Sequence, residues 1–157
     1  MDIKSLLDRL LQLEIAMRDL YGFLAAVFKD EREAAALFVR LRAQEERHAN
    51  LVKYQRRLVA HNPHRFRDVL TDVGDVDAVL ASIHAFRSTD VRPSLGEAID
   101  LAAELEGSAA ERIHGSVVAR SNPELAGLMA ALGGEDDVHR RLLEELHDRI
   151  LEQRHTA

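Results

Sequence analysis

The feature that most constrains this chain is a helical repeat of apolar residues that begins almost at its first residue. Side chains three and four positions apart share one face of a helix, so an unbroken series at that spacing predicts a long amphipathic helix over residues 3–28. The series is Ile3, Leu6, Leu7, Leu10, Leu13, Met17, Leu20, Leu24, Val27 and Phe28. A second series from Ala34 to Val59 predicts another long helix, which Asp30 caps and which ends near residues 61–63.

The second half of the chain shows two further helical patterns behind a long connection. Residues 62–94 contain two of the three prolines and the weakest periodicity, so this stretch is predicted to be a crossover containing a short helix. Ser94 is a suitable cap for a helix reaching about Val117, and Asn122 for one reaching about Ile150. The prediction is one all-α domain over residues 1–157, an antiparallel four-helix bundle whose second and third helices are joined by the crossover.

The amino-acid composition limits the kinds of metal site and the partners that this chain can have. The chain has no cysteine, so thiolate metal sites and disulfides are excluded, and any metal must be held by nitrogen and oxygen. The formal net charge is -6 with acids and bases interleaved, and no long uncharged apolar run occurs, so neither nucleic acid nor a membrane is an expected partner. The start of the chain lacks the pattern of a secretion signal, and a cytoplasmic location is expected.

An acidic residue followed by histidine three positions later is common here, so the pattern alone says little. Two of these pairs lie directly on the apolar stripes, where solvated residues are not expected: Glu45 with His48, and Asp136 with His139. The other three pairs lie at the edge of an apolar stripe, among charged residues or at the terminus: Glu111/His114, Glu144/His147 and Glu152/His155.

Two more acids interrupt apolar stripes on the other two helices. Glu14 lies between Leu10 and Met17, and Glu106 lies between Ala102 and Ile113. One carboxylate from each of two helices and a carboxylate-x-x-His pair from each of the others is the ligand set of a dinuclear site in a bundle core. The predicted metal ligands are therefore Glu14, Glu45, His48, Glu106, Asp136 and His139.

With these motifs, nearly the whole chain resembles the ferritin-like superfamily, and most closely the rubrerythrin type of di-iron domain without its rubredoxin part. The resemblance is carried by Leu13-Glu14 to Tyr21, Gln44 to Ala49, Ala98 to Ile113 and Glu135 to Leu143. It implies two iron ions and gives Tyr21 the place of a tyrosine beside the ligands. The chain departs from the family at Asp136, where glutamate is usual, and at Ile113, where a second tyrosine is usual.

The resemblance implies a homodimeric oxidoreductase of ferroxidase or peroxidase type, acting on dioxygen, hydrogen peroxide or ferrous iron. Because the chain has no cysteine for a rubredoxin-like iron site, a peroxidase would need a separate electron donor protein. Two alternatives stay open at this point. One is a dimanganese enzyme resembling catalases, with zinc as a further occupant, because oxygen-rich ligands accept several metals. The other is a metal-free structural or interaction module.

Overall fold

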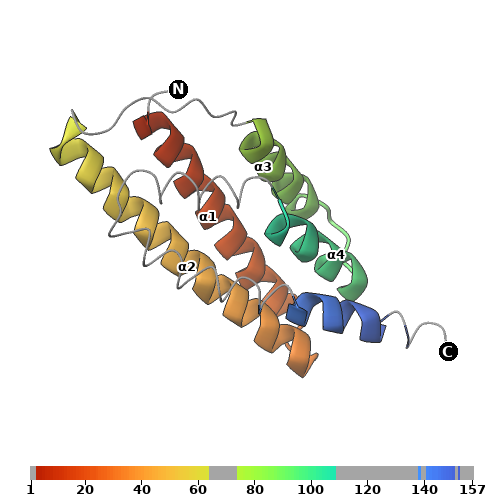
Figure 1. The fold of residues 1–157 in the computed structure, drawn as a ribbon. Helices are drawn as coiled ribbons and strands as arrows, with labels where there is room; N and C mark the ends of the chain where they lie inside the picture. The colour runs from red at the N-terminus through yellow and green to blue at the C-terminus, as the bar shows by residue number, and fades with distance from the viewer. Residues whose placement is uncertain (1–2, 64–73, 109–137, 139–140, 151, 153–157) are drawn as a thin grey trace.

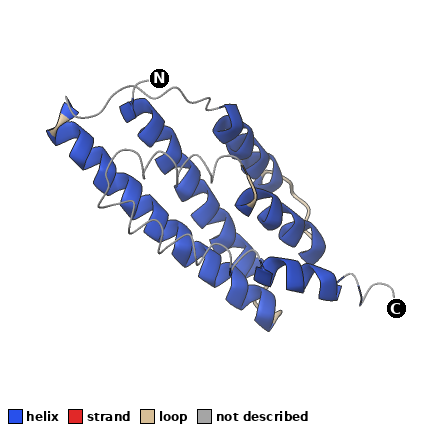
Figure 2. Ribbon diagram, in the orientation of Figure 1, coloured by secondary structure: helices blue, strands red, loops and turns tan. Residues whose placement is uncertain are grey.

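The computed structural model describes residues 3–63, 74–108, 138, 141–150 and 152. Within these residues all regular structure is helical and no strand occurs (Figure 2). The helices are α1 (Ile3–Val27), α2 (Arg32–His61), α3 (Gly74–Arg87), α4 (Leu95–Glu106) and a further helix over 141–150. The prediction of an all-α protein is therefore confirmed for the part of the chain that is described.

α1 and α2 form a long antiparallel hairpin, and α1 also packs on α3 (Figure 1). Tyr21 from α1 stacks on Phe38 from α2 with ring centroids 6.5 Å apart, and Phe28 packs 6.1 Å from the same ring. Stacked aromatic rings bury a large apolar area and fix the register of the two helices at this end. The apolar stripe of α1 is thus the centre of the core.

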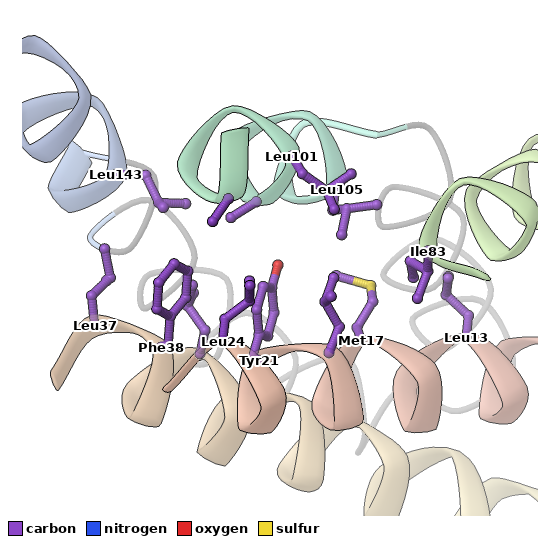
Figure 3. Packing of buried hydrophobic residues seen from close by; sticks show 14 of the residues in the cluster. Leu13, Met17, Tyr21, Leu24, Leu37, Phe38, Ile83, Leu101, Leu105 and Leu143 are labelled. Atoms are coloured by element: carbon purple, nitrogen blue, oxygen red, sulfur yellow. The ribbon is translucent and has the colours of Figure 1, made fainter. Parts of the chain in front are cut away.

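The core continues from the hairpin into the later helices. Figure 3 shows Leu101 and Leu105 of α4, Ile83 of α3 and Leu143 of the helix over 141–150 pointing toward side chains of the α1–α2 hairpin. Each of these is 8% exposed or less. Segments far apart in sequence therefore share one apolar interior, as expected for a single core.

The start of α2 differs from the prediction. Asp30 does not cap this helix; the cap position is Glu31, whose side chain makes no capping hydrogen bond. The reason is that the turn after α1 extends further than expected, since the Glu31 N–H donates to the Phe28 carbonyl at 2.9 Å. The predicted end of α2 is confirmed, because the helix stops at His61, two residues before Pro63.

The start of α4 agrees with the sequence and its end does not. Ser94 accepts a hydrogen bond from the Glu97 N–H while the Glu97 carboxylate accepts one from the Ser94 N–H, which is a capping box. α4 then ends at Glu106, with Gly107 at the cap, well before the predicted end near Val117. Glycine has low helix propensity, which favours an end at this position. Residues 109–137 lie outside the described part.

Ionic contacts join the helix over 141–150 to the rest. Arg149 Nη1 lies 2.8 Å from Glu33 Oε2 of α2, and His147 Nε2 lies 2.9 Å from Asp100 Oδ1 of α4. Both contacts are at the surface, so they contribute little stability and mainly set the direction of this helix. Among the described residues, no helix is both long and apolar enough to cross a lipid bilayer.

Candidate metal centre

Three of the predicted ligands meet inside the α1–α2 hairpin. Glu14 belongs to α1, and Glu45 and His48 belong to α2, where positions three apart share a face. Glu14 and Glu45 are 0% exposed and His48 is 2% exposed. Two adjacent carboxylates in a dry interior repel each other and lose their hydration, so this arrangement requires a compensating positive charge.

The spacing of the polar atoms suits a shared cation. His48 Nδ1 lies 3.5 Å from Glu14 Oε2 and 3.5 Å from Glu45 Oε2, and one donor atom from each residue lies within 4.8 Å of the other two. Strong hydrogen bonds to a charged imidazole are shorter, at about 2.7–2.9 Å. Two ligand atoms bound about 2.1 Å from one tetrahedral ion lie about 3.4 Å apart. The two distances from His48 are therefore compatible with the spacing of ligands around one ion.

In the absence of metal, a proton on His48 supplies the positive charge between the two carboxylates. Burial by itself lowers the pKa of this imidazole, but the Glu14 and Glu45 carboxylates outweigh it and raise the pKa to about 12. The metal-free protein therefore carries a buried imidazolium between two carboxylates. A divalent cation carries two positive charges, so it compensates the two carboxylates more completely than one proton does. His48 is then neutral and can bind the cation as a third ligand.

Glu106 is held elsewhere in the same interior. The Tyr21 hydroxyl donates a hydrogen bond of 2.7 Å to Glu106 Oε1, and Figure 3 shows that hydroxyl pointing from α1 toward α4. Tyr21 is 0% exposed, whereas Glu106 is partly exposed at the end of α4. Glu106 is not a member of the Glu14–Glu45–His48 group.

The last two predicted ligands fall in a part of the chain that the structure does not describe. Asp136 and His139 lie outside the described residues, as do both members of the pair Glu111/His114. The structure therefore brings together three of the six predicted ligands, gives a separate position to the fourth, and leaves their role as ligands a prediction. His147, which was set aside in the sequence, contacts Asp100 at the surface.

An ion pair on the outer side of the hairpin supports the centre. Arg18 of α1 donates a 3.0 Å hydrogen bond to Glu46 of α2, and it also contacts Asp19 at 2.7 Å. Hydrogen bonds to Asp19 and Glu46 raise the pKa of Arg18 above its usual value. Arg18 follows Glu14 by one helical turn and Glu46 follows Glu45 directly, so this contact holds the two ligand-bearing turns side by side.

Two buried polar residues were missed in the sequence. Gln44 is 1% exposed and Gln55 is 2% exposed, and both lie on α2. Gln55 could have been found, because it continues the line His48, Val52, Gln55 and Val59 at helical spacing, as Glu14 continues the line on α1. Gln44 lies on the same line, three residues after Leu41 and four before His48, so it could have been found in the same way.

No family model, curated protein or solved structure matches the chain. The interpretation of the centre therefore depends on its own residues and distances.

Proposed function

We propose that this protein is a carboxylate–histidine metalloprotein with two iron ions in a ferritin-like four-helix bundle, in which residues 62–94 form the crossover. The observation that supports it most directly is the buried group of Glu14, Glu45 and His48, whose donor atoms lie within 4.8 Å of one another. Two carboxylates and one imidazole are a ligand set that iron, manganese and zinc all accept. Glu106, Asp136 and His139 would complete the second position.

Each residue of the candidate centre has a definite task in this proposal. Glu14 and Glu45 bind through carboxylate oxygens and neutralise charge, while His48 loses its proton and binds through nitrogen. Tyr21 fixes one oxygen of Glu106 at 2.7 Å and so orients that carboxylate. Buried apolar residues on both helices, among them Leu10, Met17 and Val52, keep water away. Iron bound in such a site supplies electron transfer to or from dioxygen or hydrogen peroxide.

The reaction class follows from that chemistry. The protein would either oxidise ferrous iron with dioxygen or reduce peroxide with electrons from a separate protein. A homodimer is part of the same proposal, since it comes from the resemblance to rubrerythrin-type domains.

Metal analysis with matched variants tests the proposal. Wild-type protein supplied with ferrous iron is expected to retain about two metal ions per chain. The variant E45Q/H48Q removes two buried candidate ligands, and E104Q/H84Q removes the same two residue types from exposed positions. The first is expected to lose metal and the second to keep it.

Metal retained equally by both variants would contradict the assignment of these ligands, and a wild type that takes up no iron, manganese or zinc would contradict the proposal. Manganese in place of iron, with oxygen evolved from peroxide, would identify the dimanganese alternative.

A structural role is the second candidate, and one observation favours it. The raised pKa of His48 shows that Glu14 and Glu45 can hold a proton on this imidazole, so the three residues form an ionic group without any metal. Such a buried group specifies which helix faces meet. Full thermal stability in a metal-free protein that ignores added metal would support this role.

A further inference from the structure

A pocket lined by basic residues lies at the opposite end of the hairpin from the turn that joins α1 to α2. It has a volume of about 470 Å³ and is formed by Lys4 from the first turn of α1 together with Lys53, Arg56, Arg57, Ala60 and His61 from the last turns of α2. These residues are called the basic pocket below. The α2 members recur at spacings of three and four, so they present one continuous helix face.

The charge of this region departs from that of the chain as a whole. Residues 47–63 contain four lysines and arginines and no aspartate or glutamate. The chain has 27 acids in 157 residues, so 17 residues of average composition would contain about three. A local excess of positive charge in a chain of net charge -6 therefore needs a reason other than overall composition.

Contacts within the pocket hold several of these cations in place. Arg56 Nε lies 2.7 Å from Asp8 Oδ1, and Lys53 Nζ donates to Asn50 Oδ1 at 3.3 Å. The ring of His61 is fixed by a 2.7 Å hydrogen bond between Nδ1 and the Arg57 carbonyl oxygen. The ion pair with Asp8 offsets the charge of Arg56, and Lys53 and Arg57 add two further cations to the lining of the pocket.

The partial charges of the two helix ends at the pocket do not by themselves attract anions. The start of α1 at Ile3 presents a partial positive charge, and the end of α2 at His61 presents a partial negative charge of similar size. The two contributions oppose each other at this end of the hairpin. Any attraction for anions must therefore come from Lys4, Lys53, Arg56 and Arg57.

We infer that the basic pocket binds the phosphate groups of a small anion. A phosphate monoester carries about -1.5 to -2 charges at neutral pH, which suits several cations converging on one hollow. Arginine offers paired N–H donors to phosphate oxygens, and lysine adds a mobile point charge. The volume of the pocket lies within the range of about 300–1,000 Å³ usual for small-molecule sites. This site is separate from the metal centre and does not depend on it.

The test is calorimetric titration of metal-free protein with inorganic phosphate, pyrophosphate and ADP, because bound iron would itself attract phosphate. The variant K53Q/R57Q removes two lining cations and leaves the Arg56–Asp8 contact intact. The control R32Q/R40Q removes two exposed arginines from the other half of α2 and changes net charge equally. Thermal unfolding of both variants checks that they remain folded.

We expect pyrophosphate to bind more tightly than phosphate, and affinity to fall as salt rises from about 50 to about 200 mM. K53Q/R57Q is expected to weaken pyrophosphate binding by about ten-fold or more, and R32Q/R40Q by less than about two-fold. Equal affinities for ADP and pyrophosphate would support a site for inorganic phosphates, and tighter ADP binding would support a nucleotide site. No binding to the wild type, or an equal loss in both variants, would overturn the inference.

Discussion

Two groups of histidine and carboxylate in this molecule use the same residue types in opposite surroundings. Glu14, Glu45 and His48 are at most 2% exposed between α1 and α2. His147 contacts Asp100 at 2.9 Å and Asp148 at 3.7 Å, but these side chains are 38%, 64% and 76% exposed. Contact distances alone would rank the surface group as the stronger one. Burial reverses that order, because water screens the surface charges and cannot reach the buried ones.

The largest expected effect comes from removing the histidine of each group. H48A leaves Glu14 and Glu45 facing each other in a dry interior, and we expect it to lower the free energy of unfolding of the metal-free protein by about 3 kcal/mol or more. H147A removes an exposed contact and is expected to cost less than about 1 kcal/mol. Urea unfolding in the presence of a chelator measures both. Similar losses in the two variants would show that burial does not separate the groups.

The next prediction concerns pH and the buried group only. The pKa of His48 is about 12 in the folded protein and about 6.5 when unfolded, so folding strengthens proton binding. Its contribution to the stability of the metal-free protein is therefore complete below about pH 6.5 and is lost progressively as pH rises toward 12.

Metal must displace this proton, so affinity is expected to change in the opposite direction. Between about pH 7 and pH 8 the apparent affinity for zinc or ferrous iron should rise about ten-fold, with one proton released per ion bound at His48. Calorimetry in buffers of different ionisation enthalpy counts that proton. An affinity that is constant over this range would contradict the involvement of His48.

The smallest expected effects are at two polar contacts of α4, one with the buried Tyr21 and one with the half-exposed His147. Y21F removes the hydrogen bond to Glu106 and is expected to lower the free energy of unfolding by about 1 kcal/mol. D100N weakens the surface contact with His147 and is expected to cost less than about 0.5 kcal/mol. Thermal unfolding at equal pH compares them. A larger loss for D100N would show that the helix over 141–150 is held mainly through its ionic contacts.

The helix boundaries that the sequence predicts best are those set by a long apolar series or by a capping box. α1 follows its series of leucines almost to the residue, and Ser94 caps α4 because serine and glutamate three residues apart satisfy each other's backbone donors. Asp30 failed as a cap because the turn before α2 depends on the Glu31–Phe28 hydrogen bond, which sequence spacing does not report. The stop at Gly107 outweighed the apolar periodicity that continues to Val117.

Helical spacing in the sequence also predicts part of the candidate centre. Glu14, Glu45 and His48 interrupt apolar stripes, so their burial and their approximate meeting point follow from helical spacing. Whether Glu106 joins them does not follow, because this depends on where α4 ends and on which oxygen Tyr21 holds. The 3.5 Å distances likewise depend on how closely two helices pack, and no periodicity encodes that separation.

The turn between α1 and α2 has a kinetic consequence. It spans only residues 28–31, and the ligands that meet across it, Glu14 and His48, are 34 positions apart in the chain. Contacts between nearby parts of a chain form quickly during folding, and the N-terminal part of a protein leaves the ribosome first. The acidic pocket can therefore assemble around His48 before the second half of the chain has been synthesised. Its imidazolium is available at that stage as a counter-ion, which keeps the two carboxylates together without any metal.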